Sequence, residues 1–297
     1  MSFVRSLASS ALPPEPSTAN PNAGAPVWID TDLAMGASRG DVDDGYAVAA
    51  MLCAGSDRVL GISTVSGNAP ADVAARCSRA LLSAARVEKQ VIQGAMRPGQ
   101  DTAAAEAIAA LPAGTHVLAL GPLSNIAAAL RRDPSLAGRV TVYLVGGNLT
   151  SRGRFPPLWP HEFNLAIDPA AAACVFAAPL RRRVHPLDSC GRLLVSGGDL
   201  LRFASASAFG AFLVRQSLRW WLLSPLRLRA LRFPLWDLAP ALDLLGLLPA
   251  PVETRRMSLQ GRGLLVPDEN APPSEFIRTI DRRTAIANFE RRLRASP

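Results

Sequence analysis

The stretch WIDTDLAMGASRGDVDDGYA, residues 28–47, joins an apolar run to a helical pattern through a glycine-containing turn. The run PVWID (26–30) is typical of a buried strand, and the small and apolar residues of 45–53 are typical of a helix. A strand followed by a turn and a helix is the first half of a βαβ unit. The stretch therefore predicts a parallel sheet.

The same alternation continues along the chain. Further strands are predicted at VLGIST (59–64), THVLAL (115–120), VTVYLVGG (140–147) and RRRVHPLD (181–188), and helices at 71–85, 123–131 and 169–177. No internal repeat or linker interrupts the pattern after residue 26. We expect the fold class α/β, a single-domain open, mostly parallel sheet with helices on both faces. This domain covers residues 26–297, after a disordered N-terminal tail at 1–25.

Sheets of this kind bind ligands beyond the carboxyl ends of their strands. The segments that end at Asp30, Leu120, Gly147 and Asp188 should therefore converge on one crevice. We expect the functional residues to lie there.

Composition excludes several classes of protein. The 297 residues are 49% hydrophobic and 19% charged, which excludes wholesale disorder. The four cysteines form no C-x-x-C pair, which excludes a zinc ribbon, and they are too few and too scattered for a disulfide scaffold. We expect a cytoplasmic protein.

The net charge of +8 comes almost entirely from arginine, since Lys89 is the one lysine. Two explanations stand: codon bias in a GC-rich genome, or a patch for nucleic acid or an acidic surface. The arginines are spread along the chain, although 215–232 is dense, so we expect no nucleic-acid partner. The longest uncharged stretch, 107–130, contains Pro112 and Gly121. These residues break it, and we expect no membrane partner.

Five carboxylates gather within the 15 positions 30–44 (Asp30, Asp32, Asp41, Asp43 and Asp44). Such a cluster repels itself unless protons or a cation neutralise it. Helix capping explains one or two of these aspartates but not five. With no Cys or His nearby, oxygen ligation favours Ca²⁺ or Mg²⁺ over zinc. An EF-hand is excluded, because Met35 stands where its loop requires glycine.

Several motifs in order resemble the nucleoside hydrolases, Ca²⁺-dependent enzymes that release the base from ribonucleosides. The D-T-D and D-D-G-Y-A pieces resemble their N-terminal signature, and the match extends over about 26–245. The other matching segments are VSGNA (65–69), LGPLSNIAAAL (120–130), YLVGGN (143–148), HEFNLAIDPAAA (161–172) and FPLWDLAPAL (233–242). The resemblance implies a small-molecule nucleoside substrate and a homo-oligomer, a dimer or tetramer.

The resemblance also implies the cofactor Ca²⁺ and its ligands. Asp32, Asp44, Asp237 and the main-chain carbonyl of Leu120 would hold the ion. Positions would remain for a water and two ribose hydroxyls. Asp32 would be the catalytic residue, the base that takes a proton as the water attacks the anomeric carbon.

Further residues match family positions that bind substrate. Asp43, Glu162 and Asn164 would hold ribose hydroxyls around an oxocarbenium-like transition state, and Asn68 would line the same end. Asp30 would orient the site from behind. Local capping is the alternative for Glu162 and Asn164, and a plain turn role is the alternative for Asn68.

A tryptophan, Trp236, stands directly before Asp237, where many relatives have a histidine. This arrangement resembles the purine-preferring branch, whose members stack the base on an indole. Trp159 would supply a second stacking ring, since none occurs between Gly94 and Leu111. The segment 214–235, rich in Arg and Trp, would form a helical flap beside the site.

Three departures from the family leave alternatives open. The turn between Asp32 and Asp43 is long, the second stacking tryptophan is displaced, and the asparagine expected before the E-F-N motif is absent. These features would also suit a catalytically weakened relative that binds nucleoside or ribose. A D-x-D phosphatase that uses Mg²⁺, with Asp30 as nucleophile, is a further alternative.

Overall fold

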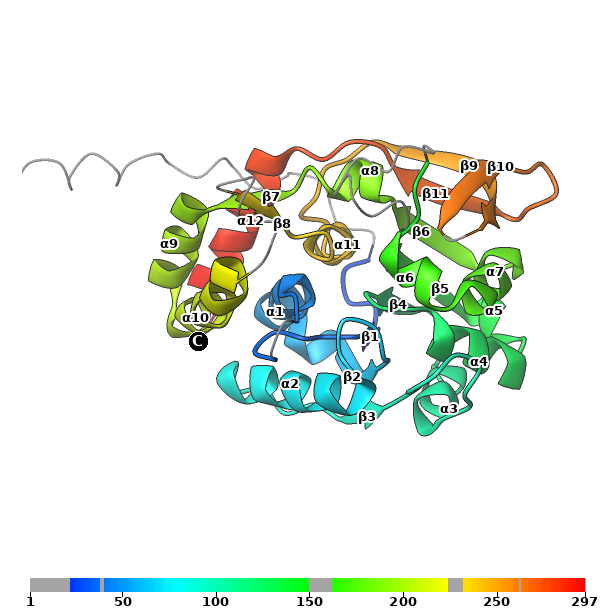
Figure 1. Cartoon of the computed structure of the whole chain (residues 1–297), viewed down its shortest axis with the longest axis horizontal. Helices are drawn as coiled ribbons and strands as arrows, with labels where there is room; N and C mark the ends of the chain where they lie inside the picture. The colour runs from blue at the N-terminus through cyan, green and yellow to red at the C-terminus, as the bar shows by residue number, and fades with distance from the viewer. Residues whose placement is uncertain (1–21, 38–39, 150–161, 224–231, 262, 297) are drawn as a thin grey trace, which may run out of the picture.

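A computed structural model describes residues 22–37, 40–149, 162–223, 232–261 and 263–296. In this part of the chain a nine-stranded sheet has the order β10-β9-β11-β6-β5-β4-β1-β2-β3 (Figure 1). The strands from β11 to β3 pair in parallel, and β9 and β10 add an antiparallel edge. The strands are β1 (Val27–Thr31), β2 (Val59–Thr64), β3 (Val91–Gln93), β4 (Thr115–Ala119), β5 (Val140–Val145), β6 (Arg181–His185), β9 (Val252–Gln260), β10 (Leu264–Pro267) and β11 (Pro273–Ile277).

Helices cover both faces of the sheet, and a separate apolar cluster lies between each face and its helices. One face carries α1 (Asp43–Gly55), α2 (Ala71–Ala84), α11 (Leu238–Leu244) and α12 (Arg282–Arg294). The other carries α3 (Ala103–Ala109), α4 (Ser124–Arg132) and α7 (Pro169–Ala177). Short elements complete the described chain: η2 (Ser56–Arg58), α5 (Leu136–Arg139), α6 (Phe163–Ile167), α8 (Leu187–Cys190), β7 (Leu194–Ser196) and β8 (Arg232–Pro234).

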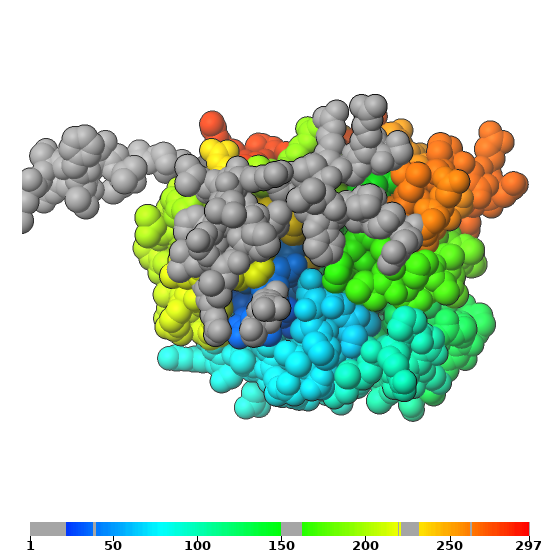
Figure 2. Space-filling model, in the orientation of Figure 1, coloured from blue at the N-terminus to red at the C-terminus, as the bar shows by residue number. Residues whose placement is uncertain are grey.

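Two helices, α9 (Gly197–Ala206) and α10 (Ala208–Leu223), form a pair beside α12. Figure 2 shows this yellow-green pair at one side of the molecule and the orange β9–β10 hairpin at the other. Within the predicted flap at 214–235, Trp220 of α10 packs edge-on against Phe233, with ring centroids 5.3 Å apart. Residues 224–231 lie outside the described part.

The predicted α/β fold class is confirmed. The predicted strand VLGIST coincides with β2, and the predicted helix at 169–177 coincides with α7. The other four predicted strands and the other three predicted helices occur with shifted ends. The strand prediction at 181–188 was too long, because β6 ends at His185 and Pro186 precedes the short helix α8. Within the described residues, no helix combines the length and apolar character that a membrane crossing requires.

Part of the predicted N-terminal tail packs on the domain. Asn22 donates its side-chain N–H to Tyr143 Oη over 2.9 Å. Arg58 donates to the carbonyls of Asn22 and Ala25 over 2.8 and 2.9 Å. Residues 22–25 are thus held by the domain, and residues 1–21 of the predicted tail lie outside the described part.

Helix α1 is anchored from behind by a buried aromatic group. Tyr46 is fully buried, its hydroxyl lies 2.9 Å from Ser217 Oγ, and its ring contacts Phe203 and Phe289. These partners belong to α10, α9 and α12. The helical layer therefore fixes the start of α1, where Asp43 and Asp44 stand.

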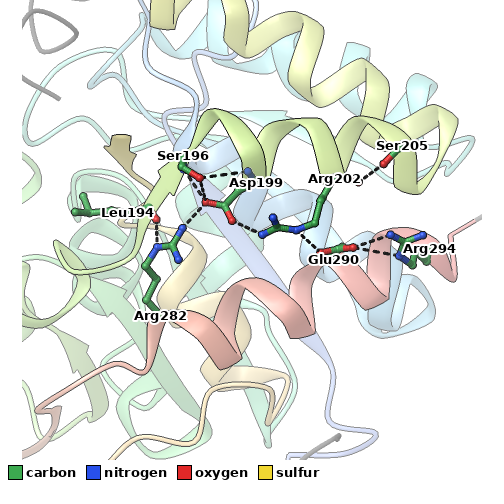
Figure 3. A network of polar contacts seen from close by, with 8 residues as sticks. All are labelled: Leu194, Ser196, Asp199, Arg202, Ser205, Arg282, Glu290 and Arg294. Atoms are coloured by element: carbon green, nitrogen blue, oxygen red, sulfur yellow. Dashed lines mark hydrogen bonds and ion pairs between the residues drawn. The ribbon is translucent and has the colours of Figure 1, made fainter. Parts of the chain in front are cut away.

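An ion-pair network joins α9 to α12 (Figure 3). Glu290 of α12, 3% exposed, accepts hydrogen bonds from Arg202 Nε over 3.0 Å and Arg294 Nη2 over 2.7 Å. Asp199 pairs in turn with Arg202 and Arg282. The network fixes the C-terminal helix against the layer that supports α1.

We predict that Glu290→Ala lowers the free energy of unfolding by about 1–3 kcal/mol, because two arginines lose a buried acceptor. Urea denaturation measures the effect. Glu269→Ala, at an exposed turn, is the control and leaves the midpoint unchanged. Equal midpoints for the two variants would show that the network contributes nothing.

Candidate active site

The carboxyl ends of the central strands bring the predicted site residues together. Asp32 follows β1, Leu120 follows β4, and Asp43 and Asp44 open α1. Asp237 directly precedes α11, and its carboxyl lies close enough to Asp44 for a side-chain hydrogen bond. Residues from four separate segments thus share one buried acidic cluster.

The carboxylates of this cluster are buried and only partly satisfied. Asp32 is 0% exposed, and its Oδ2 accepts the backbone N–H of Asn68 over 2.6 Å. Asp44 accepts a short hydrogen bond from the hydroxyl of Thr31. Among the described residues, Asp32 Oδ1, Asp43 Oδ1 and Asp44 Oδ2 have no partner. Buried acceptors without donors indicate a missing positive group.

Electrostatics leads to the same conclusion. Burial, opposed by the Asn68 hydrogen bond and reinforced by neighbouring carboxylates, raises the pKa of Asp32 to about 7. Burial raises the pKa of Asp44 and of Asp237 well above the ordinary value, and the charges of the neighbouring aspartates raise it further. A cation among these oxygens would relieve the cost of ionising them. The oxygen-only donor set fits a hard divalent ion.

Asp41 is a member of the cluster that the sequence did not single out as a ligand. Carboxylate oxygens of Asp41, Asp43 and Asp44 lie within 4.8 Å of one another. Asp41 Oδ1 also accepts the side-chain N–H of Asn68 over 3.2 Å. Asn68 therefore links Asp32 to Asp41 and does more than complete a turn. The spacing D-V-D-D was the available signal for this role.

Glu162 caps the helix α6, as the alternative to a ribose-binding role predicted. It accepts the backbone N–H groups of Asn164 over 2.9 Å and Leu165 over 2.6 Å at the start of α6. Burial raises the pKa of Glu162 to about 7, although these hydrogen bonds oppose the shift. Asn164 donates its side-chain N–H to the carbonyl of Leu120 over 2.8 Å. Asn164 thereby orients the carbonyl predicted as a ligand, which keeps a second lone pair.

Asp30 lies beneath the cluster in a polar network of its own. Its Oδ1 accepts Ser63 Oγ over 2.5 Å and Asn125 Nδ2 over 2.8 Å. Trp28 donates its indole N–H to the same Ser63 oxygen. Burial, opposed by the hydrogen bonds, raises the pKa of Asp30 to about 6. This bonding fixes Asp30 as a support for the strand end.

Of the two predicted base-stacking residues, the structure describes Trp236 alone. Trp159 lies outside the described residues. Trp236 is half-buried directly before Asp237 and packs on the larger apolar cluster, and its buried Nε1 has no partner among the described residues. Trp236 is thus held next to the acidic cluster by its neighbour in the chain.

Gly67 permits the close approach of a loop to Asp32. A Cβ at this position would lie 2.0 Å from Asp32 Oδ2 and 2.9 Å from Pro122 Cδ. Gly138 would place its Cβ in open space, and its φ is ordinary. Gly67 lies in the loop between β2 and α2, and Gly138 lies within α5.

We predict that Gly67→Ala weakens divalent-cation binding at least about tenfold, because the methyl group displaces the Asp32 carboxylate. Gly138→Ala is the matched control and should leave binding unchanged. Calorimetric titration of Ca²⁺ into both variants measures the difference. Wild-type affinity in Gly67→Ala would contradict the placement of Asp32 at the cation.

The sequence matches the family model described as "Inosine-uridine preferring nucleoside hydrolase" over residues 27–250. The chain belongs to this nucleoside hydrolase family. The matched range includes every predicted site residue and ends at the loop after α11.

Curated nucleoside hydrolases from enteric bacteria are similar to the chain. A non-specific ribonucleoside hydrolase RihC of Klebsiella pneumoniae (strain 342) is 27% identical over 220 residues, covering 63% of this chain and 69% of that protein. RihC of Salmonella enteritidis is 29% identical over 204 residues, covering 58% of this chain and 66% of the relative.

Solved nucleoside hydrolases share the fold. The plant nucleoside hydrolase PpNRh1 superposes with a TM-score of 0.74 at 20% identity, over 91% of this chain and 98% of that one. A purine-preferring ribonucleoside hydrolase from Gardnerella vaginalis gives a TM-score of 0.73 at 18% identity, over 90% and 99%. The chain is therefore an enzyme, a hydrolase that acts on the N-glycosidic bond of ribonucleosides, in a metal-dependent family.

Proposed function

We propose that this nucleoside hydrolase uses Ca²⁺ to split purine ribonucleosides into free base and ribose. The observation that carries the proposal is the set of buried, unpartnered oxygens on Asp32, Asp43 and Asp44. Oxygen ligands in this number suit Ca²⁺, which takes six to eight, better than Mg²⁺, which retains several waters.

In this proposal Asp32, Asp44, Asp237 and the carbonyl of Leu120 hold the cation. Asp41 joins them or acts through Asn68, to which it is hydrogen-bonded. When bound, the ion supplies a fixed point of coordination for ribose hydroxyls and the attacking water. Four segments of chain contribute these ligands, so the bound ion would also tie together the strand ends.

Asp32 is the proposed general base. One of its oxygens is held by the N–H of Asn68, which leaves Oδ1 to accept a proton from the attacking water. Asp43, Glu162 and Asn164 hold the ribose, and the negative carboxylates favour the positive charge that develops on the sugar. Asp30 supports the site from below. Both of its hydrogen bonds fall on Oδ1, and Oδ2 has no partner among the described residues. The full burial of this carboxyl argues against the phosphatase alternative, in which it would be a nucleophile open to substrate.

Purine preference rests on Trp236, which directly precedes the proposed ligand Asp237. Stacking favours the larger purine surface and stabilises the leaving base without a side-chain acid. We predict that kcat/KM for inosine exceeds that for uridine at least about tenfold, and that Trp236→Ala lowers the inosine value about tenfold or more.

Ribose release from both nucleosides measures this preference, with Trp236→Phe as the matched variant that keeps an aromatic face. Comparable kcat/KM values for uridine and inosine in the wild-type enzyme would exclude purine preference. Tight binding of both nucleosides without any turnover would instead favour a binding relative.

We also propose that the chain works as a homo-oligomer in the cytoplasm. All four cysteines are free, as suits a reducing compartment. Light scattering on the purified protein tests the assembly, and a monomer at micromolar concentration would contradict it.

A further inference from the structure

A cleft of about 620 Å³ lies at the end of the sheet opposite the acidic cluster. It is lined by residues at the starts of β4, β5, β6 and β11, whereas the cluster lies where strands end. The loop at 246–250, after α11, forms its apolar wall with Leu248, Pro249 and Ala250. The volume is that of a typical small-molecule site.

The floor of the cleft consists of two rows of side chains on neighbouring strands. His116, Thr141 and Arg181 are register partners on β4, β5 and β6 and form the outer row. The inner row consists of Tyr143, Arg183, Glu275 and Thr254, which are register partners on β5, β6, β11 and β9. Members of both rows line the cleft.

The inner row satisfies its own polar groups. Arg183 donates to both carboxylate oxygens of Asp243, over 2.6 and 2.8 Å, and to Glu275 over 2.9 Å. Its guanidinium lies 6.0 Å from the ring of Tyr143, whose hydroxyl accepts Asn22. The row and Asp243 together set two carboxylates against one guanidinium, so the inner row offers a ligand no free positive charge.

Polar groups of the outer row lack partners among the described residues. Arg181 is exposed, and no described carboxylate lies within ion-pair distance of it. His116 Nδ1 is buried without a hydrogen-bond partner among the described residues. Its ring is held edge-on against Tyr143, with centroids 5.4 Å apart. Strand spacing puts Arg181 and His116 roughly 10 Å apart at the backbone, and an arginine side chain reaches across part of that distance.

Positive charge surrounds this row. Burial lowers the pKa of His116, and the nearby charges of Arg58 and Arg181 lower it further. Both arginines therefore act on the same point of the cleft. The two arginines give this end of the cleft a positive potential, which favours a bound oxyanion.

We propose that this cleft is a second ligand site, which binds a small phosphorylated molecule. Arg181 contacts the phosphate oxygens, and Thr141 on the neighbouring strand offers a hydroxyl. His116, whose Nδ1 is enclosed, borders the site with its ring. The organic part lies against Leu248 and Pro249. Arginine favours phosphate because its planar fork pairs with two oxygens at once. The site is separate from the proposed Ca²⁺ centre and does not depend on it.

Calorimetric titration of inorganic phosphate, pyrophosphate, ribose 5-phosphate and acetate tests the proposal. EGTA in the buffer removes divalent cations, so that phosphate cannot bind through a metal. We expect one site per chain with a dissociation constant of roughly 1 mM or lower for the phosphates. Arg181→Ala should weaken binding at least about tenfold.

Arg131→Ala is the matched control, since Arg131 is an exposed arginine at the end of α4 on the opposite face. Its affinity for phosphate should equal that of the wild type, as should that of Asp44→Asn at the other end of the sheet. The proposal would be overturned if the wild-type protein did not bind phosphate, or if it bound acetate as tightly as phosphate. It would also be overturned if Arg131→Ala and Arg181→Ala lowered the affinity for phosphate equally.

Discussion

Asp44→Asn should abolish Ca²⁺ binding and reduce inosine hydrolysis by at least about a thousandfold. It should also raise the thermal midpoint of the metal-free protein, by roughly 2–4 °C. The carboxylate is 1% exposed, and one of its oxygens has no partner. Replacing one charge in such a crowded group removes like-charge repulsion from the folded state, while the amide oxygen can still accept the Thr31 hydroxyl.

The opposite signs of these effects make the prediction specific. A variant that merely unfolds loses activity and stability together. Asp57→Asn, at an exposed position in η2, is the control and should change neither quantity. Calorimetry with Ca²⁺ and thermal denaturation in EGTA measure both effects. Unchanged Ca²⁺ affinity in Asp44→Asn would contradict the proposed ligand set.

Asp32→Asn should separate catalysis from cation binding. The asparagine side chain keeps one oxygen, which can accept the Asn68 N–H. Its NH2 group cannot take a proton from water. We therefore expect kcat to fall about 10³-fold or more, within the range of general-base effects, while KM for inosine changes much less. Ca²⁺ should still bind through Asp44, Asp237 and the carbonyl of Leu120, with an affinity reduced at least about tenfold.

Steady-state kinetics and Ca²⁺ calorimetry on the same preparation give both numbers. Asp30→Asn is a useful comparison, because Asp30 lies two residues before Asp32, within β1, and supports the site from below. It should keep substantial kcat. If Asp32→Asn retains wild-type kcat, another residue must act as the base.

Strong local patterns made the central fold predictable. The apolar runs of β1, β2, β4 and β5 each end in a turn and precede a helix, so the parallel core followed from the sequence. Strand β9 escaped prediction because VETRRMSLQ carries charges along a largely solvent-facing edge. Strand β3 is three residues long, too short for a pattern to develop.

The candidate site was predictable only as far as motifs reach. The acidic cluster follows from D-x-D and D-V-D-D, which are close in sequence. The hydrogen bond between Asn164 and the Leu120 carbonyl joins residues 44 positions apart, and the bond between Asn68 and Asp32 joins residues 36 apart. Nothing local in the chain specifies such contacts. The outer row of the proposed phosphate site likewise depends on the register of β4, β5 and β6.

The most direct test of the account is ribose release from inosine as EGTA is added and cations are then restored. We expect EGTA to abolish ribose release, Ca²⁺ to restore it fully, and Mg²⁺ to restore it poorly. Full activity in excess EGTA, with the protein folded, would contradict the proposal that the acidic cluster works through a bound cation.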